Sequence, residues 1–363
     1  MNPRFIAFYL PQYHPVPEND EWWGKGFTEW TNVAKARRLF PGHKQPRIPA
    51  DLGFYDLRLP EVREAQAALA REAGIEGFCY WHYWFGNGKR LLERPFNEVL
   101  LSGKPDFPFC LAWANHSWKK KLWDPDAPGK DILLIEQLYP GVEDYIAHFE
   151  ALLPAFKDQR YIKVNGKLLF MIYKADGFTD IQLFMNTWKE LAKKNGLNDF
   201  YFITTDADSR HRERNMDLGF DAICNTDPFN IHHRCSLFTK VLLMIGRKLG
   251  IPTVFQYKKA IDYMINEDCK DRDVIPCLIP NWDHSPRSGK NAIVLHNAHP
   301  KYFKKLVKIS LQTVADKPKE EQLIFIKSWN EWGEGNYMEP DLEFGKGYLT
   351  ALSEALEENR PNP

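Results

Sequence analysis

Short runs of apolar residues recur along the chain, and each gives way to polar and aromatic residues. Eight of these runs predict buried strands, at residues 5–10, 75–85, 107–114, 168–173, 200–205, 220–225, 274–280 and 323–326. Helical spacing and helix-end signals predict helices at residues 60–73, 91–101, 142–156, 181–195, 299–315 and 349–359. Asn165-Gly166, between two apolar runs, predicts a hairpin.

Strands that alternate with helices favour a parallel sheet. Eight such units predict an α/β fold, a (β/α)8 TIM barrel with extended βα loops, that forms a single domain over residues 1–363. The longest gap between strands predicts a loop and helix insertion around residues 228–272. A long loop rich in aromatic residues should follow the first strand, and such loops are more often functional than accidental.

Residues 323–340 contain the strongest chemical signal. An apolar strand, Leu323 to Ile326, is followed by Glu331 and Glu334 with Trp329 and Trp332 around them. In a helical or turn conformation this spacing puts both carboxylates on one face, with Cβ atoms about 5–6 Å apart. Each then perturbs the pKa of the other, which gives the acid and the base that glycosidic chemistry needs. The competing interpretation is a solvated Glu-x-x-Glu pair without function, which is common on helices.

Composition narrows the class of partner. Aromatic residues make up 14% of the chain and include 12 Trp, several beside polar residues, which favours a ligand cleft. Lys and Arg number 48, as do Asp and Glu, so the formal net charge is zero and nothing indicates a nucleic-acid partner. The apolar run after Met1 is too short for a signal peptide, and the six Cys lack a C-x-x-C pair. Cys79, Cys110, Cys224 and Cys277 lie in or beside apolar runs, which fits a reducing compartment. With no signal peptide visible, we expect a cytoplasmic protein; the oligomeric state stays open.

Aromatic and polar residues at the predicted strand ends are candidates for sugar binding, because flat rings stack on pyranose faces and hydrogen bonds select hydroxyl orientation. For any one ring the alternative is core packing. The candidate set is Tyr9, Tyr13, Glu29, Trp30, Trp81, His82, Trp84, Trp113, Asn115, His116, Asp206, Trp282 and Asn330.

The sequence indicates no metal and no cofactor. Its histidines are scattered without metal-ligand spacing, and it has neither a G-x-G-x-x-G motif nor a phosphate-binding loop. The basic cluster from Arg210 to Arg214 is interpreted as a solvated loop, with a phosphate or nucleotide-sugar contact as the alternative. Residues 235–265 combine basic and apolar side chains. We favour an ordinary helix with a solvated basic face there over a helix on a membrane surface.

Several motifs resemble one family of carbohydrate-active enzymes. Trp329-Asn-Glu-Trp-Gly-Glu-Gly-Asn-Tyr-Met-Glu-Pro is similar to the catalytic segment of glycoside hydrolase family 99, the endo-α-mannosidase and endo-α-mannanase group. Phe8-Tyr-Leu-Pro-Gln-Tyr-His-Pro, Gly26-Phe-Thr-Glu-Trp-Thr-Asn-Val, Tyr80-Trp-His-Tyr-Trp-Phe and Leu111-Ala-Trp-Ala-Asn-His resemble its WbsX-type branch. Members of that branch are described as glycosyltransferases or polysaccharide-biosynthesis proteins of bacterial O-antigen and capsule clusters.

The resemblance implies a (β/α)8 barrel and a retaining mechanism through a 1,2-anhydro sugar. By matched position, Glu331 would deprotonate the sugar 2-hydroxyl and Glu334 would protonate the leaving oxygen. The substrate would be an α-linked glycan of mannose or rhamnose type. The chain departs from the hydrolases at Gly333, where they have His, and at Gln12. Hydrolysis or transglycosylation is favoured; a nucleotide-sugar-dependent glycosyltransferase and a non-catalytic glycan-binding barrel are the alternatives.

Overall fold

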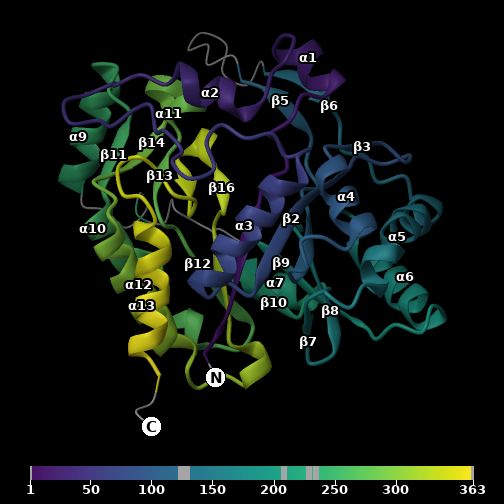
Figure 1. Cartoon of the computed structure of the whole chain (residues 1–363). Coiled ribbons are helices and arrows are strands. Elements are labelled where there is room, and N and C mark those ends of the chain that lie inside the picture. The colour runs from purple at the N-terminus through teal and green to yellow at the C-terminus, as the bar shows by residue number, and fades with distance from the viewer. Residues whose placement is uncertain (1, 122–130, 206–210, 226–230, 232–236, 361–363) are drawn as a thin grey trace. The chain divides into compact units, whose positions relative to one another are not determined.

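The computed structural model describes residues 2–121, 131–205, 211–225, 231 and 237–360 of the 363-residue chain. The chain forms two compact units. The first joins Met1–Phe78 to Cys224–Pro363, and the second is Cys79–Ile223. Figure 1 shows the helices and strands of both, labelled where there is room.

The first unit holds both ends of the chain. Its strands are β1 (Arg4–Tyr9), β11 (Thr253–Gln256), β12 (Val274–Leu278), β13 (Trp282–Asp283), β14 (Ile293–His296), β15 (Leu323–Ile326), β16 (Asn330–Glu331) and β17 (Asn336–Tyr337). Its α-helices are α1 (Pro17–Trp23), α2 (Glu29–Lys35), α3 (Pro60–Ala73), α9 (Leu237–Lys248), α10 (Tyr257–Ala260), α11 (Ser285–Ser288), α12 (Pro300–Val314) and α13 (Gly347–Glu358). Its 3-10 helices are η2 (Ile261–Tyr263), η3 (Glu267–Lys270), η4 (Gly289–Asn291), η5 (Lys319–Glu321) and η6 (Trp332–Glu334).

The core of the first unit is a parallel sheet. Strand β15 pairs in parallel with β1, where Phe5 lies opposite Ile324, and with β12, where Cys277 lies opposite Phe325. All four residues of β15 are buried, as expected for a strand covered on both faces. A smaller sheet joins β11 to β14 in parallel and β14 to β13 antiparallel. These strands carry the segments that build the candidate site.

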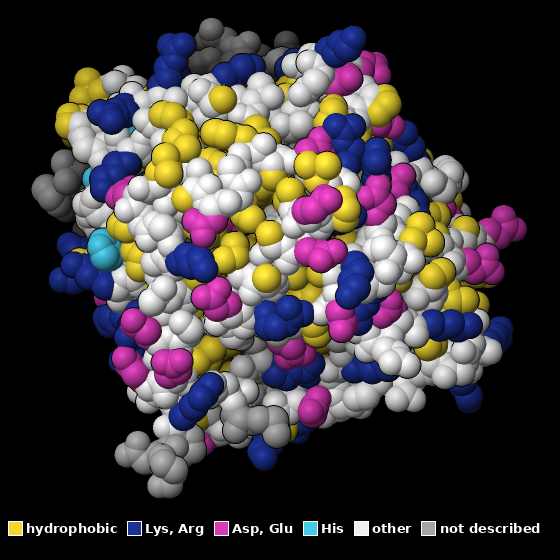
Figure 2. All heavy atoms as spheres, viewed as in Figure 1, with side chains coloured by type: hydrophobic (Ala, Val, Ile, Leu, Met, Phe, Trp, Pro, Cys, Tyr) yellow, Lys and Arg dark blue, Asp and Glu magenta, His cyan; other side chains and the backbone are white. Residues whose placement is uncertain are grey.

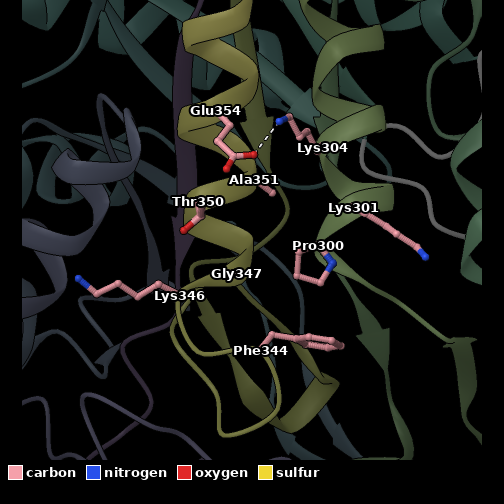
Figure 3. Close-up of a pocket in the computed structure, with 9 residues that line it drawn as sticks. All are labelled: Pro300, Lys301, Lys304, Phe344, Lys346, Gly347, Thr350, Ala351 and Glu354. Carbon is pink, nitrogen blue, oxygen red and sulfur yellow. Dashed lines mark hydrogen bonds and ion pairs between the residues drawn. The ribbon is translucent and has the colours of Figure 1, made fainter.

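Helices α12 and α13 lie side by side in the first unit (Figure 1). Each buries an apolar stripe and turns charged residues outward. The Lys304 ammonium on α12 contacts the carboxylates of Glu354 at 2.6 Å and Glu358 at 2.7 Å on α13. A surface hollow of about 390 Å³ lies near the N-terminal ends of the two helices, beside the Lys304–Glu354 pair (Figure 3).

The second unit also pairs parallel strands with helices. Its strands are β2 (Gly77–Trp84, which begins in the first unit), β3 (Arg90–Leu91), β4 (Phe109–Trp113), β5 (Trp118–Lys120), β6 (Ile132–Ile135), β7 (Lys163–Val164), β8 (Lys167–Ile172), β9 (Phe200–Thr205) and β10 (Ala222–Asn225, which ends in the first unit). Its helices are α4 (Arg94–Ser102), α5 (Val142–Lys157), α6 (Ile181–Lys194) and α7 (Arg212–Asp217). Strand β8 pairs in parallel with β4 and β9. The predicted hairpin is confirmed, because β7 pairs antiparallel with β8 around Asn165 and Gly166.

An aromatic cluster fixes α5 and α6 on the β8–β9 pair. Trp188 is fully buried, and its ring lies 4.8 Å from the ring of Phe170 and 5.4 Å from that of Phe200. Phe149 and Phe156 of α5 contact the same indole. The helical period that places these rings on one face is what the sequence predicted for residues 142–156 and 181–195.

The predicted strands and helices are present, with shifts of a few residues at their ends. The region after β1 differs from the prediction of one long loop, because it contains the short helices α1 and α2. Their signals are local: Pro17 stands at the first turn of α1, and Thr28 forms a capping box at the start of α2. The many aromatic residues of this region favoured the interpretation as a loop over these helix signals.

Charges are mixed over the visible surface. In Figure 2, dark blue Lys and Arg side chains alternate with magenta Asp and Glu side chains, also over α12 and α13. The described helices include none that is long and apolar enough to span a bilayer.

Candidate active site

A tight hairpin after β15 carries the two predicted catalytic carboxylates. Ser328 stops the strand, since its hydroxyl accepts hydrogen bonds from the backbone N–H groups of Asn330 (3.1 Å) and Glu331 (2.8 Å). Strand β16 pairs antiparallel with β17, and η6 between them carries Glu334. Gly335 closes the turn at φ +54°, a left-handed conformation that favours glycine. Glu331 and Glu334 therefore belong to one turn, as the sequence predicted.

Backbone contacts with the end of β1 hold this hairpin in place. The Asn330 side chain accepts from the N–H of Leu10 (2.8 Å) and donates to its carbonyl (3.1 Å). The Tyr13 hydroxyl donates to the Asn330 carbonyl and accepts from the Trp332 N–H at 3.0 Å. Asn330 and Tyr13, both candidates for sugar binding, thus have their polar groups engaged in fixing the hairpin.

The buried Glu339 stabilises the hairpin through a hydrogen bond with Trp332, a role that the sequence did not predict. Its buried carboxyl accepts hydrogen bonds from the indole N–H of Trp332 (2.6 Å), the amide of Gln66 (2.7 Å) and the hydroxyl of Tyr55 (2.9 Å). Burial raises the pKa of Glu339 to about 7, even though these bonds act to lower it. The other predicted residue here, Tyr9, donates its hydroxyl to Gln66 at 2.7 Å.

Arg287, from α11, joins the carboxylates of the site. Its Nη1 lies 3.0 Å from Oε1 of Glu331 and 2.6 Å from Oε1 of Glu334, and its Nε lies 3.1 Å from Oε2 of Glu29. One nitrogen contacts both members of the predicted pair, which places their oxygens on the same side of the hairpin. Coulombic attraction by the three carboxylates raises the pKa of Arg287 well above its usual range, against the effect of burial. The guanidinium is therefore a permanent positive charge.

Glu29 fills the space beside Gly333. A Cβ atom at Gly333 would lie 1.9 Å from Oε2 of Glu29 and 3.0 Å from Nε of Arg287, so any side chain there must displace Glu29. Glu29 belongs to α2, a neighbour of η6, and is buried. The sequence singled out Glu29 and the departure at Gly333 separately, and the structure shows that the two are coupled.

The electrostatics separate the two carboxyl groups of the pair. Burial and then the charge of Glu334 raise the pKa of Glu331 to about 7, although Arg287 opposes this. Burial also acts to raise the pKa of Glu334, but Arg287 and a hydrogen bond with His284 outweigh it and lower that pKa to about 2. Near neutral pH Glu331 is therefore the member of the pair that takes up a proton, and Glu334 is ionised. Two carboxyl groups with pKa values moved apart are the arrangement that acid–base catalysis requires.

The segment between β13 and α11 supplies a histidine to the pair. Nε2 of His284 lies 3.3 Å from Oε1 of Glu334, and its Nδ1 lies 2.7 Å from the hydroxyl of Ser288. The ring of Trp282 is nearly parallel to that of His284, with centroids 6.2 Å apart. Trp282, a predicted sugar-binding residue, is buried in this place. His284 therefore links Ser288 to Glu334 through its two ring nitrogens.

Trp30 packs against the hairpin through the rings of Trp332 and Tyr13. Its indole N–H donates to the carbonyl of Tyr55 at 2.7 Å, and its ring centroid lies 4.6 Å from that of Tyr13 and 5.8 Å from that of Trp332. The ring is partly exposed. Among the predicted residues of the first unit, the structure thus gathers Tyr13, Glu29, Trp30, Asn330, Glu331 and Glu334 around η6, with Trp282 beyond His284.

The second unit contains a separate group of predicted residues. His82 and His148 are buried with their Nε2 atoms 2.8 Å apart, and Trp84 stacks on His148 at 4.6 Å while its indole donates to Asp144 at 3.0 Å. The indole of Trp113 donates to the carbonyl of Trp84 at 2.8 Å. Trp84, Trp113 and His82 are therefore interior groups of this unit.

Asn115 and His116 follow β4. The Asn115 amide donates to the Lys174 carbonyl at 2.7 Å and accepts from the Lys174 N–H at 2.8 Å, which links the end of β4 to the end of β8. Burial and then Lys174 lower the pKa of His116 to about 4. The rings of His116 and Trp81 both contact Tyr173 and are partly exposed. Asp206 lies outside the described residues.

Within the described part of the chain, no three His, Cys, Asp or Glu side chains are arranged to hold a metal ion. The site described above consists of carboxylates, one guanidinium, one imidazole and aromatic rings. Such groups can take up and release protons beside aromatic rings.

The fold is shared with solved structures of sugar-cleaving enzymes. A glycoside hydrolase-like protein aligns with a TM-score of 0.62 and 15% identity, covering 98% of this chain and 94% of that chain. The GH99 endo-α-mannosidase from Bacteroides thetaiotaomicron, in complex with Bis-Tris propane, aligns with a TM-score of 0.59 and 16% identity, covering 98% and 96%. A second structure of that enzyme gives 0.57 and 16%, covering 98% and 97%. The chain therefore has a (β/α)8-barrel fold, which confirms the prediction made from its strands and helices.

Residues 5–352 match the family model described as Glycosyltransferase WbsX, so this chain belongs to the WbsX family of carbohydrate-active enzymes. Uncharacterized proteins named WxcX from two strains of Xanthomonas campestris pathovar campestris are each 37% identical over 354 residues. The alignment covers 97% of this chain and 49% of each relative, so the chain spans about half the length of the curated relatives it matches. The resemblance seen in the motifs is confirmed.

The histidine pair of the second unit predicts a pH-dependent stability. Burial, and then the charge of Arg90, lowers the pKa of His82, and burial, His82 and Arg90 lower that of His148. In the unfolded chain both histidines titrate near a pKa of about 6.5, so below that pH the unfolded state binds more protons. We expect the free energy of unfolding to fall as the pH decreases below about 6.5, by up to about 1.4 kcal/mol per pH unit for each histidine.

Urea unfolding between pH 5 and pH 8 measures this effect. The variant His82→Gln/His148→Gln is the matched comparison, because other histidines titrate in both proteins. Wild type should lose more stability than the variant over this range. Parallel pH curves for the two proteins would contradict the prediction.

The contact between Glu29 and Gly333 generates a second prediction. The substitution Gly333→Ala should displace the buried Glu29 carboxylate and weaken its contact with Arg287, lowering the free energy of unfolding by about 1–3 kcal/mol. Combining it with Glu29→Ala, which empties the space, should cost less than the sum of the two single changes, because the residues are in contact. Denaturant unfolding of the four proteins measures the coupling. Strict additivity would show that the two positions are independent.

Proposed function

We propose that this chain cleaves or transfers α-linked glycosyl units of a bacterial polysaccharide such as O-antigen or capsule. The observation that carries the proposal is the hairpin on which Glu331 and Glu334 face one guanidinium with their pKa values moved apart. Membership of the WbsX family supports a sugar substrate. The GH99-like fold supports chemistry at an α-linkage.

In the proposed mechanism Glu331 removes the proton from the sugar 2-hydroxyl, and that oxygen attacks the anomeric carbon to form a 1,2-anhydro sugar. At the same time Glu334 gives its proton to the glycosidic oxygen, whose bond to the anomeric carbon breaks. An acceptor hydroxyl then attacks the anomeric carbon and opens the three-membered anhydro ring. The proton of the acceptor passes to Glu334, and Glu331 returns to the 2-oxygen the proton that it removed. Two carboxylates on one turn suit this route, because the 2-oxygen and the glycosidic oxygen belong to neighbouring carbons. The route differs from the usual one, in which two carboxylates flank the bond.

The electrostatics of the unliganded chain define how the cycle must begin. Near neutral pH the pair holds its proton on Glu331, whereas the proposed roles need it on Glu334. Glu331 must therefore release its proton and Glu334 must gain one when substrate binds, and we assign the His284 imidazole, whose Nε2 lies 3.3 Å from Glu334, as the donor to Glu334. Once ionised, Glu331 is a stronger base than an ordinary glutamate because its pKa is raised.

The acceptor defines the class of reaction. Water gives hydrolysis, and a sugar hydroxyl gives transglycosylation. Transfer from a nucleotide-sugar is the second candidate, favoured by the description of the family as glycosyltransferases. Of the basic cluster considered for a phosphate contact, Arg214 pairs with Asp176 at 2.5 Å.

Substituting the pair tests the assignment of roles. A screen of α-mannose- and α-rhamnose-containing polysaccharides first supplies a substrate. Glu331→Gln and Glu334→Gln should each lower the rate by about 10²–10⁴-fold on that glycan. On an aryl glycoside with a good leaving group, Glu334→Gln should recover most of its loss in kcat/KM, which reports the bond-breaking step, and Glu331→Gln should not, because only the acid becomes dispensable in that step. Product analysis by mass spectrometry separates hydrolysis from transfer.

The exposed variant Glu358→Gln on α13 is the control for these rates. Recovery by Glu331→Gln instead of Glu334→Gln would reverse the two roles, as the unliganded electrostatics alone suggest. Near-wild-type rates for both variants would remove the pair from the mechanism.

The anhydro sugar generates a further prediction. A substrate with hydrogen or fluorine in place of the 2-hydroxyl cannot form the intermediate, so it should be nearly inert and leave no adduct. A carboxylate nucleophile would instead be trapped by a 2-fluoro glycoside with a good leaving group. Intact-protein mass spectrometry after incubation measures this, with the 2-hydroxy glycoside as the matched control. A stable adduct on Glu331 or Glu334 would exclude the anhydro route.

A further inference from the structure

A second cavity in the first unit lies directly beside the turn that carries Glu334. It has a volume of about 510 Å³, within the range of sites that bind small ligands. Its wall includes Gly335, the neighbour of Glu334, and Asp283, the neighbour of His284. We call this cavity the β13–β14 pocket, because those strands form one side of it. None of the residues assigned above to the acid–base pair lines it.

The packing between β13 and the hairpin fixes the pocket relative to the site. A Cβ atom at Gly335 would lie 2.8 Å from Cβ of Asp283 and 2.9 Å from its carbonyl oxygen, so the two backbones are in close contact. The Asp283 carboxylate is engaged elsewhere: Oδ2 lies 2.7 Å from Nε2 of His43 and accepts from the amide of Gln45 at 2.7 Å. The pocket wall and the turn that carries Glu334 therefore share the Asp283–Gly335 contact.

Rings form much of the pocket lining. His296, His299, Tyr302 and Phe344 line it, and the ring centroids of His299 and Phe344 are 5.0 Å apart. Flat rings next to polar groups suit a pyranose, which has apolar faces and a polar edge. Asn281 and Trp282 also line the pocket.

Positive charge exceeds negative charge in the lining. Lys44 and Arg47 share one carboxylate, that of Glu343. Lys301 lies 5.0 Å over the ring of Tyr302, and no carboxylate of the described residues pairs with it. In Figure 3 its side chain extends away from the Lys304–Glu354 ion pair.

The pKa values of His296 and His299, two imidazoles that line the pocket, are affected by these cations. Burial lowers the pKa of His299 first, and Lys301 and Lys44 lower it further, while Glu343 opposes them. Burial and then His43 lower the pKa of His296, Asp283 opposes them, and Arg47 and Lys44 lower it further. Three cations thus act on the interior of the pocket.

We propose that the β13–β14 pocket binds an anionic sugar unit of the glycan, adjacent to the unit on which the Glu331–Glu334 pair acts. Rings hold the pyranose, and Lys44, Arg47 and Lys301 hold its negative group. That group is either the carboxylate of a hexuronic acid or the phosphoryl group of a sugar phosphate or diphosphate. The assignment rests on the proposed function for its place in the reaction, but binding itself does not depend on turnover.

Binding is measured on the full chain carrying Glu331→Gln, so that no reaction intervenes. The imidazole proton signals of His296 and His299, assigned by single His→Gln variants, are followed by NMR during titration. The ligands are a hexuronic acid disaccharide, a neutral disaccharide of the same linkage, a hexose phosphate and a nucleoside diphosphate. We expect saturable shifts with at least one anionic sugar. The dissociation constant of the neutral disaccharide should be at least about fivefold higher than that of the anionic sugar.

Matched lysine variants locate the negative group. Lys301→Gln and Lys44→Gln should each weaken binding of the anionic sugar by about fivefold and reduce its salt dependence, with no effect on the neutral sugar. Lys304→Gln is the control, because Lys304 lies near Lys301 but pairs with Glu354 and Glu358 and lines only the neighbouring hollow. A carboxylate preference identifies an acidic polymer, and a phosphoryl preference without need of the nucleoside identifies a sugar phosphate.

Several results would overturn the proposal. These are no imidazole shift with any anionic sugar, equal affinity for the neutral disaccharide, or a loss in Lys304→Gln as large as in Lys301→Gln. A nucleoside diphosphate that binds as well as the sugar ligands would also overturn it, since the sugar ring would then be irrelevant. Loss of the proposed catalytic function leaves these binding results unchanged, so the two hypotheses fail separately.

Discussion

The contact between one guanidinium and three carboxylates is the constraint on which the rest of the site depends. Arg287 holds Glu29, Glu331 and Glu334 within 3.1 Å of its nitrogens in a buried place. Buried carboxylates without a partner would either take up protons or force the hairpin apart. The effect on the pair is unequal, because Arg287 lies closer to Glu334 and His284 adds a hydrogen bond there: Glu334 is ionised, and Glu331 keeps a pKa near neutrality.

The surroundings of that contact are built from hydrogen bonds that leave the hairpin little freedom. Asn330 binds the backbone of Leu10 in both directions, and Tyr13 bridges the backbone of the hairpin. Glu339 holds Trp332 from the opposite side. Side chains locked in this way keep reacting groups in a fixed geometry, so less reorganisation is needed when charge moves.

Family membership and electrostatics give complementary information about function. The WbsX match and the GH99-like fold define a carbohydrate-active enzyme. The hydrolases that the hairpin motif resembles have His at the position of Gly333, and in this chain Glu29 occupies the space that a larger residue would take. In this chain a larger residue at Gly333 would have to displace Glu29 from its place beside Arg287, so the departure at Gly333 is coupled to a second position. The cation-rich β13–β14 pocket adds a feature that suits an acidic polymer or a sugar phosphate.

Local pattern by itself determined the strands, the helices and the acid pair. Alternating apolar runs and helical periods specify the βα units, and the three-residue spacing specifies that Glu331 and Glu334 share a turn. Tertiary structure decided which charges meet that pair. Arg287 lies 44 residues before Glu331 and 258 residues after Glu29, in a short helix with no periodic signal. Within residues 329–340 no Lys or Arg is present, so the sequence showed an unneutralised pair, and only folding brings the cation to it. The physical reason is that sequence patterns report local geometry, whereas a pKa depends on every charge within a few ångströms, whatever its distance along the chain.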